Sequence, residues 1–285
     1  MMNAGKHIIL VESGATKSAW RILDAEGEVL REFVRKGMNV STMCIDDILD
    51  NISEAFEIDG MKECAGFYLY TAGVVTDSVR AAIVDRVRSI IEIESIDVQD
   101  DLVGAARAVC GHSPGIAVIL GTGSNACFYN GSSITRNVYS GGFILGDEGS
   151  AAALGKLFVA DFIKNLVPAD IAEDFSAEFD TSYAAIVRGV YKSESPSGYL
   201  GSFAPFLLRH KDNPYVGNLI YSNFEAFMDR ILLKYDTDNY SVGVVGGFAY
   251  ACRDIVESVF AARGVRLSCI LKEPVQGLCA YHVKR

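Results

Sequence analysis

Positively charged side chains are scarce in this sequence and form no cluster. The chain of 285 residues has 26 lysines and arginines against 36 aspartates and glutamates, a formal net charge of −10 at pH 7. A surface that binds nucleic acid or an anionic membrane needs gathered positive charge. We therefore expect neither nucleic acid nor membrane among the partners of this protein.

Long hydrophobic runs are also missing. The longest uncharged apolar stretch covers residues 242–252, well short of the ~20 residues that cross a bilayer. The first apolar run, Ile8 to Val11, has four residues, fewer than the ~7 to 15 of a signal-peptide core. A cytoplasmic location is the expectation that follows.

The cysteines and histidines form none of the usual ligand patterns. The seven cysteines are scattered without a CxxC pair, and the four histidines show no HExxH spacing. Neither a disulfide framework nor a metal site built from these residues is expected.

Hydrophobic periodicity predicts an α/β chain that uses one hairpin plan twice. The length suggests about two domains at ~100 to 200 residues each. In the first half we expect three strands joined by tight turns, then helix, strand, helix and strand. These elements are expected at 7–13, 18–24, 27–36, 44–56, 65–71, 76–92 and 95–99.

The second half begins the same plan again. We expect three strands at 115–120, 125–129 and 133–139, helices at 148–166, 249–263 and 274–283, and strands at 241–245 and 266–271. The predicted domains are residues 1–113 and 114–285, the second with a helical insertion around 165–235 and a last helix free to pack on the first domain. Within the insertion, SESPSGYLGS at 193–202 has the composition of a loop.

Two turns rich in small residues follow the first strand of each half. SGATKS at 13–18 and GTGSN at 121–125 let the backbone approach a ligand and direct N–H groups and hydroxyls at a phosphate. A P-loop would need glycine at positions 11 and 16 and a helix after Ser18, none of which is present. The alternative is that both turns are ordinary hairpin connections.

Acidic residues lie at the ends of predicted strands. They are Glu12, Asp100, Asp101, Asp147 and Glu148. Carboxylates in such positions hold Mg²⁺ or take a proton from a hydroxyl. Capping is the alternative for Asp100 and Asp147, since each precedes a helical segment. The Gly246-Gly247 pair is either a plain turn or a flat surface for a nucleotide at a helix N-terminus.

Seven sequence blocks in order resemble the superfamily of sugar kinases, actin and heat-shock chaperone ATPases. Within it they are similar to the N-acetylglucosamine kinase family related to the BadF/BadG ATPases. The blocks are ESGATKS, GMNVS, QDDLVGAARA, ILGTGSNA, GGFILGDEGSAAALG, VVGGFA and EPVQGL. The resemblance implies two ribonuclease H-like (actin-like ATPase) domains with a central cleft, ATP and Mg²⁺ as cofactors, and a small sugar as substrate.

The resemblance also implies roles for individual residues. Asp101 corresponds to the catalytic base, although the adjacent Asp100 leaves this assignment open by one residue. Glu12 stands where the family usually has an aspartate that faces Mg²⁺, which makes the catalytic strength of this chain a question. Two further sets are implied: cofactor binding by Gly14, Thr16, Lys17, Gly121, Thr122, Gly123, Ser124, Gly246 and Gly247, and substrate binding by Asn39, Asp101, Thr122, Gly142 and Asp147.

Three functions are compatible with these motifs. The first is phosphorylation of an amino sugar, with N-acetylglucosamine and its 6-hydroxyl as the leading choice. The second is an ATPase activator of the 2-hydroxyacyl-CoA dehydratase type, which needs cysteines for an iron–sulfur cluster. The third is a sensor that binds sugar or nucleotide without turnover. The apolar stretch at 213–228 is expected to serve either the core or a homodimer interface.

Overall fold

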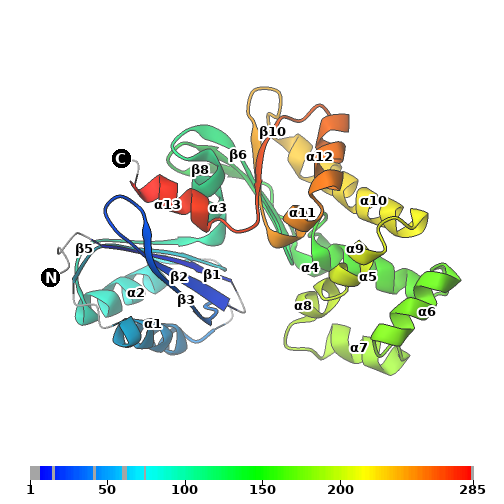
Figure 1. Ribbon diagram of the computed structural model, residues 1–285, viewed down its shortest axis with the longest axis horizontal. Helices are drawn as coiled ribbons and strands as arrows, with labels where there is room; N and C mark the ends of the chain where they lie inside the picture. Colours follow the sequence, from blue (N-terminus) through cyan, green and yellow to red (C-terminus); the bar gives the residue numbers. More distant parts are fainter. Residues whose placement is uncertain (1–6, 15–16, 41–42, 60–62, 74, 284–285) are drawn as a thin grey trace. The chain divides into compact units, whose positions relative to one another are not determined.

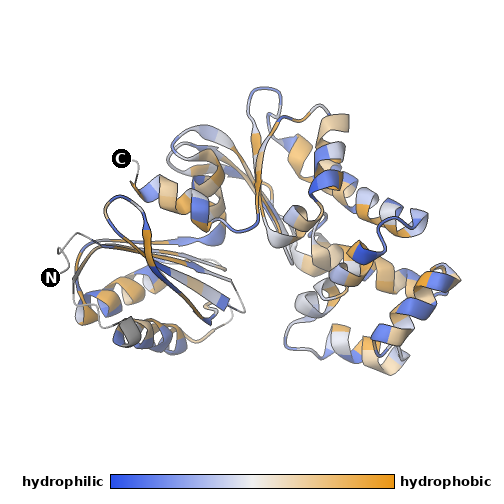
Figure 2. Cartoon of the chain, viewed as in Figure 1, coloured by the Kyte–Doolittle hydropathy of each residue, from blue (hydrophilic) through white to orange (hydrophobic). Residues whose placement is uncertain are grey.

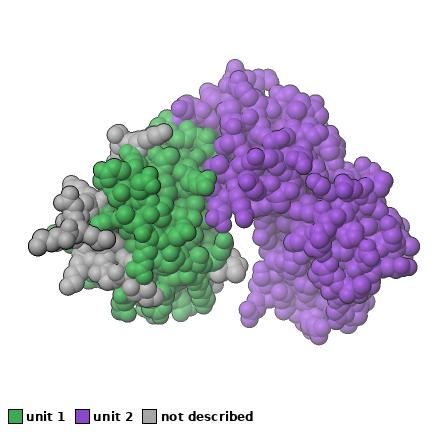
Figure 3. Space-filling model, in the orientation of Figure 1, with its two compact units in different colours: residues 1–112, 274–285 green, residues 113–273 purple. Residues whose placement is uncertain are grey.

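The chain folds into two compact units. The computed structural model describes residues 7–14, 17–40, 43–59, 63–73 and 75–283. Unit 1 comprises Met1–His112 with Pro274–Arg285, and unit 2 comprises Ser113–Glu273 (Figures 1 and 3). The chain therefore returns to unit 1 for its last helix, so that the second unit ends at residue 273.

Unit 1 is a mixed five-stranded sheet with helices on both faces (Figure 1). The strand order is β3-β2-β1-β4-β5, antiparallel between the first three strands and parallel between β1, β4 and β5. The elements are β1 (Ile8–Ser13), β2 (Lys17–Leu23), β3 (Val29–Lys36), α1 (Ile45–Asp59), β4 (Glu63–Thr71), α2 (Asp77–Ile90), β5 (Glu92–Asp100), α3 (Asp101–Cys110) and α13 (Val275–Val283).

Strand β1 is apolar over residues 8–11, where both of its faces are covered. Ile9 and Val11 point to one side, into a core with Trp20 and the apolar faces of α1 and α2. Leu10 points to the other side, where Tyr70 and residues of α3 and α13 pack. Figure 2 shows hydrophobic residues along α2 and α13, helices that lie on these two faces.

Unit 2 repeats the same sheet. Its strand order, β8-β7-β6-β9-β10, matches that of unit 1 position by position, with the same antiparallel and parallel pairs. This confirms the duplicated plan read from the sequence. The strands are β6 (Pro114–Leu120), β7 (Ser124–Asn130), β8 (Ile134–Asn137), β9 (Val242–Val245) and β10 (Leu267–Leu271).

The helices of unit 2 depart from expectation in three places. They are α4 (Gly142–Leu145), α5 (Ala151–Phe162), α6 (Ala169–Glu178), α7 (Tyr183–Tyr191), α8 (Pro196–Gly201), α9 (Ala204–Arg209), α10 (Pro214–Arg230), α11 (Gly247–Ala251) and α12 (Arg253–Ala262), with a 3₁₀ turn at Leu232–Lys234. The helix expected at 148–166 is shorter at both ends: it begins at Ala151, after the Ser150 N-cap, and ends at Phe162. The helix expected at 249–263 is broken at Cys252.

The prediction of a loop at 193–202 is wrong, since α8 lies there. Pro196 occupies the first turn of that helix, where its fixed φ is favourable and its missing N–H costs nothing. Pro205 and Pro214 likewise lie in the first turns of α9 and α10. Leu200 of α8 is buried, and its backbone packs against Gly155 of α5. Tertiary packing of this kind is invisible in a Pro/Ser/Gly composition.

The apolar stretch at 213–228 forms α10. Val216, Ile220, Phe224, Phe227 and Met228 of this helix are buried in the core of unit 2. This places the apolar face of the helix in the core, the first of the two uses considered for it. Among the helices that the structure describes, none combines the length and apolar character needed to cross a membrane.

Candidate functional site

Three parallel strands of unit 1 end at the same level. Ser13 of β1 is paired with Thr71 of β4, and Thr71 is paired with Asp100 of β5. Ligands of open α/β sheets bind beyond such carboxyl ends. Glu12, one residue before the end of β1, is partly buried there. The structure thus gathers the acidic residues expected in the first half at one edge of one sheet.

Asn39 is held at this same edge by two buried hydroxyls. Ser13 Oγ accepts from the N–H of Met38 at 2.7 Å, and the hydroxyl of Thr71 donates to the carbonyl of Met38. Asn39 forms a β-bridge with Ala72, directly after β4. Thr71 was not singled out from the sequence, and Ser13 was named only as part of the SGATKS turn. Their only signal was a hydroxyl side chain at the end of an apolar strand.

The structure separates the roles of the two adjacent aspartates. Asp100 is the N-cap of α3, and its carboxylate accepts from the N–H of Val103 at 3.0 Å. For this residue the capping interpretation therefore holds. Asp101 is the first residue of the helix, and its carboxyl is not used in the cap.

Burial and like charge together change the protonation of Asp101. Desolvation is the largest cause, followed by the charges of Asp100 and Glu12, and together they raise the pKa of Asp101 to about 7. Backbone N–H groups of Leu102 and Asp101 itself act in the opposite direction. A carboxyl with a pKa near neutral pH is suited to take up and release a proton under physiological conditions.

The first turn closes a tight hairpin. The N–H of Gly14 donates to the carbonyl of Lys17 at 3.0 Å, and Lys17 is exposed as the first residue of β2. Thr16, expected in the same phosphate loop, lies outside the residues that the structure describes. The turn between two antiparallel strands agrees with a hairpin rather than a P-loop, where a helix would follow.

The second turn has both bonded and unbonded backbone groups among the described residues. Carbonyls of Gly121 and Thr122 accept from the N–H groups of Ala151 and Ala152, at 2.9 and 3.1 Å, which ties the turn to the start of α5. Within the described residues, no hydrogen bond engages the N–H of Thr122 or Gly123. A phosphate would find two donors there.

Ser124 completes this turn with an unusual buried hydroxyl. The residue is 6% exposed, and its Oγ makes no hydrogen bond within the described part of the chain. Buried polar atoms are nearly always paired, so an orphaned one calls for a ligand or a special role. Gly121, in the same turn, has no atom within 4 Å of the place a Cβ would take. The turn thus offers donors and space together, which fits a phosphate group.

Asp147 adjoins the second turn and does not cap a helix. Its N–H donates to the carbonyl of Ser140, and its carboxylate accepts from the N–H of Ser124 at 3.4 Å. The backbone of Asp147 has φ of 57°, a conformation that non-glycine residues adopt rarely and mostly where structure or function demands it. Burial raises the pKa of Asp147, against the opposing effects of the hydrogen bond from the Ser124 N–H and of the Lys156 charge.

Gly142 begins the short helix α4 in the segment that precedes Asp147. It has φ of 68° and no neighbour within 4 Å of a Cβ position. Lys156 Nζ donates to the carbonyl of Phe143 at 2.8 Å, which attaches this segment to α5. On α10, the buried amide of Asn223 bonds Gly149 and Ser150. Lys156 and Asn223 were not expected from the sequence and are recognisable only from these contacts.

The two glycines after β9 have different environments. A Cβ on Gly246 would lie 2.1 Å from the carbonyl oxygen of Leu120, and its φ is 143°. Gly246 is therefore required by packing against the end of β6. Gly247, the first residue of α11, has nothing within 4 Å of its Cβ position. Open space beside the second turn is where the resemblance expects adenosine.

The candidate residues therefore form two groups, one in each unit. Unit 1 gathers Glu12, Asn39 and Asp101 with the first turn, and unit 2 gathers the second turn with Asp147 and the Gly246-Gly247 pair. Among the described residues, no group of three or more histidine, cysteine, aspartate or glutamate side chains could hold a metal ion.

We expect Asp101→Asn to stabilise the folded protein more at pH 8 than at pH 5. The folded pKa of about 7 lies above the ordinary 3.8, so stability falls as pH rises between these values and the cost is fully present above pH 7. The difference corresponds to ~4 kcal/mol at most, and residual contact with water reduces it to on the order of 1 to 3 kcal/mol. Thermal unfolding at both pH values measures the effect.

The control for this prediction is Asp100→Asn, which keeps an oxygen to cap α3 and removes the neighbouring charge. It should lower the pH at which Asp101 titrates, as followed by NMR of the metal-free protein. An Asp101 that titrates near pH 4 in the wild type would contradict the assignment.

Two solved structures that resemble this chain over nearly its whole length carry provisional names as N-acetylglucosamine kinases. A provisionally assigned N-acetylglucosamine kinase from Porphyromonas gingivalis is 35% identical, with 98% of this chain and 99% of that one covered and a TM-score of 0.91. A second such protein, from Chromobacterium violaceum, is 20% identical over 98% and 99% of the two chains, with a TM-score of 0.75, and supports the fold. No family model matches the chain.

A curated relative extends the comparison. The N-acetylmuramic acid/N-acetylglucosamine kinase of Clostridium acetobutylicum is 28% identical over 159 residues, 53% of this chain and 51% of the relative. The chain thus matches about half the length of this relative. The paired ribonuclease H-like, actin-like ATPase units implied by the motifs are confirmed, and the chain belongs to the N-acetylglucosamine kinase family.

Proposed function

We propose that this protein transfers the terminal phosphoryl group of ATP to a hydroxyl of an amino sugar, with the 6-hydroxyl of N-acetylglucosamine as the first candidate. The observation that carries the proposal is Asp101, which burial and the Asp100 and Glu12 charges bring to a pKa of about 7 at the carboxyl edge of the sheet. The membership of the chain in the N-acetylglucosamine kinase family supports the same activity.

Asp101 would act as general base. The ionised carboxylate accepts the proton of the sugar hydroxyl as the hydroxyl oxygen attacks phosphorus, and the bond to the leaving diphosphate breaks in line. A base whose pKa lies near the working pH balances the fraction ionised against the strength of the base. Asn39, held beside Ala72 by Ser13 and Thr71, would bind a sugar hydroxyl at the same edge.

The two turns would hold the phosphates of ATP. In unit 2, the N–H groups of Thr122 and Gly123 and the buried Ser124 hydroxyl are donors without partners among the described residues. Fixed donors aimed at developing charge stabilise a transition state without reorganisation. In unit 1, Gly14 and Lys17 would contribute from the first turn, together with Thr16.

Glu12 fits the role of holding Mg²⁺. Oxygen ligands and bridging waters are what this ion prefers, and Glu12 lies at the end of β1 where its charge is felt by Asp101. When bound, the ion neutralises charge on the phosphates. Compared with aspartate, the extra methylene of glutamate moves the carboxylate by about 1.5 Å, and near-attack geometry is sensitive to ~1 Å. Glu12 would therefore hold the ion with a carboxylate placed differently from that of an aspartate.

Of the other hypotheses, the dehydratase activator is not favoured, since the relatives are kinases of amino sugars. The curated relative's name covers N-acetylmuramic acid as well as N-acetylglucosamine. Both sugars therefore belong in a substrate screen, beside glucose, N-acetylmannosamine and N-acetylgalactosamine.

The first test is a coupled ADP-release assay over these sugars, with the product identified by mass spectrometry and ³¹P NMR. We expect turnover with N-acetylglucosamine and a 6-phosphate product. Asp101→Asn should lower kcat by about 10²- to 10⁴-fold, the usual contribution of a general base, while ATP binding measured by calorimetry persists. A variant that keeps the wild-type rate would remove Asp101 from the mechanism. Binding of both ligands without turnover in the wild type would favour the sensor.

The nucleotide site is tested by a pair of glycine variants. Gly247→Leu fills open space, so it should weaken ATP binding at least ~10-fold, about 1.4 kcal/mol, without changing the melting temperature or sugar affinity. Gly246→Ala should instead lower the melting temperature, because its Cβ would overlap the Leu120 carbonyl. ATP affinity that is unchanged in Gly247→Leu would mean that adenosine binds elsewhere.

A further inference from the structure

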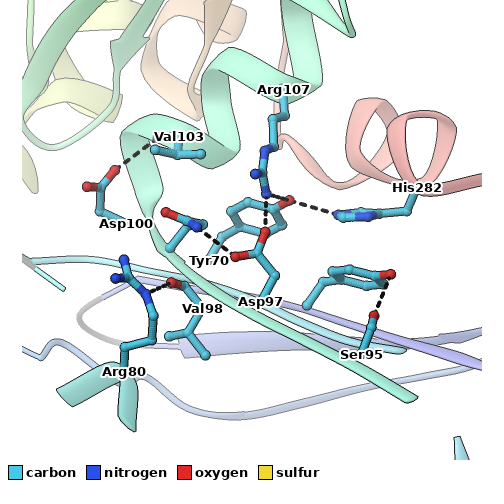
Figure 4. Close-up of polar contacts among 11 residues, drawn as sticks. Tyr70, Arg80, Ser95, Asp97, Val98, Asp100, Val103, Arg107 and His282 are labelled. Carbon is cyan, nitrogen blue, oxygen red and sulfur yellow. Dashed lines mark hydrogen bonds and ion pairs between the residues drawn. The ribbon is translucent and has the colours of Figure 1, made fainter. Parts of the chain in front are cut away.

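A partly buried polar cluster lies behind the corner at which β5 becomes α3. Arg107 of α3 forms an ion pair with Asp97 of β5, with Nη1 and Oδ2 2.6 Å apart (Figure 4). The corner residues Asp100 and Asp101 lie between these two partners in the sequence. The ion pair therefore links β5 directly to α3 across the corner that joins them.

The same guanidinium joins two further elements. Nη1 of Arg107 donates to the phenol oxygen of Tyr70 on β4 at 2.8 Å, and that oxygen lies 2.8 Å from Nε2 of His282 on α13. Arginine can only donate, so the Tyr70 oxygen is the acceptor in its bond with Arg107. Burial raises the pKa of Tyr70, which keeps this hydroxyl protonated. Arg107 also packs over the ring of Tyr281.

Close backbone packing leaves α3 little freedom to move away from this cluster. A Cβ on Gly104 would lie 2.9 Å from the ring of Tyr70, so α3 sits against β4 at a distance that glycine permits. On α13, a Cβ at Gly277 would lie 2.2 Å from the carbonyl oxygen of Ala108. The helix is thus held between β4 and α13, and what remains to be fixed is its rotation and its shift along its own axis.

Directional bonds from Arg107 supply that remaining constraint. A buried ion pair adds little net stability compared with apolar packing of the same volume, but it defines geometry. The Nε of Arg107 is itself buried without a hydrogen-bond partner among the described residues, so the side chain is not arranged for the greatest stability. Its bonds run across the corner that presents Asp101.

We propose that Arg107 is a positioning residue for the reaction, which fixes Asp101 through the Asp97 ion pair and the Tyr70 hydrogen bond. This rests on the proposed kinase function. It also gives the C-terminal helix a role, because α13 braces the same cluster through His282 and Gly277.

The test compares kcat and KM in four variants. Arg107→Met should lower kcat by about 10- to 100-fold, the loss expected for a base displaced by about 1 Å, with KM for ATP and sugar within about 3-fold of wild type. Arg107→Lys, which keeps a cation for Asp97, should recover part of kcat. Tyr70→Phe should lower kcat by a smaller factor.

Tyr68→Phe is the matched control. It removes one phenol oxygen on the same strand and the same face, where Tyr68 bonds Ser95 at 3.1 Å, and it should leave kcat unchanged. If Arg107 had only a structural role, kcat would fall in proportion to the melting temperature, and by the same relation in Tyr68→Phe and Tyr70→Phe. Arg107→Lys would then recover none of the kcat lost in Arg107→Met. Either result would overturn the positioning role.

Amide hydrogen exchange supplies a readout that needs no activity. Peptides covering residues 98–106 should exchange faster in Arg107→Met than in wild type, while peptides of α1 are unchanged. Unchanged exchange at 98–106 would overturn the proposal even in an active enzyme. If the wild type phosphorylates no sugar but exchange at 98–106 responds, the proposed function fails while the structural constraint from Arg107 stands.

Discussion

The register of three parallel strands is the constraint on which the site depends. Strands β1, β4 and β5 end side by side at Ser13, Thr71 and Asp100. Glu12, Asn39 and Asp101 therefore lie at the same edge of the sheet. This arrangement gives the two adjacent aspartates different environments. The carboxylate of Asp100 accepts the hydrogen bond that caps α3, whereas Asp101 lies in a poorly hydrated position beside the negative charges of Asp100 and Glu12.

Much of the fold could be predicted from the sequence because it follows from local patterns. The paired hairpins, the buried parallel strands and the repeated plan all carry period-2 or continuous apolar signals, and the two sheets have the expected equivalent order. The failures have a different origin. The helix at 196–201 depends on contact between Leu200 and Gly155, and the break at Cys252 has no mark in the residue pattern.

Candidate site residues could be named from the sequence where residue type alone indicates the chemistry. Glu12, Asp101 and the second turn could be named in advance, but the choice between Asp100 and Asp101 required the hydrogen bond to Val103. Other residues around the site form hydrogen bonds with partners 10 to 74 residues away in the chain; they are Ser13, Thr71, Lys156, Asn223 and Arg107. No local motif reports such partners, and they decide where the named residues point.

The central claim is that Asp101, free of the helix cap and shifted by burial, is the base of a sugar kinase. The most direct measurement is kcat/KM between pH 5 and pH 9, with ATP and N-acetylglucosamine both well below their KM so that the free enzyme is reported. The account predicts that the rate rises with pH through a single ionisation near 7 and that Asp100→Asn moves this ionisation to lower pH. A rate that stays constant down to pH 5 would contradict it.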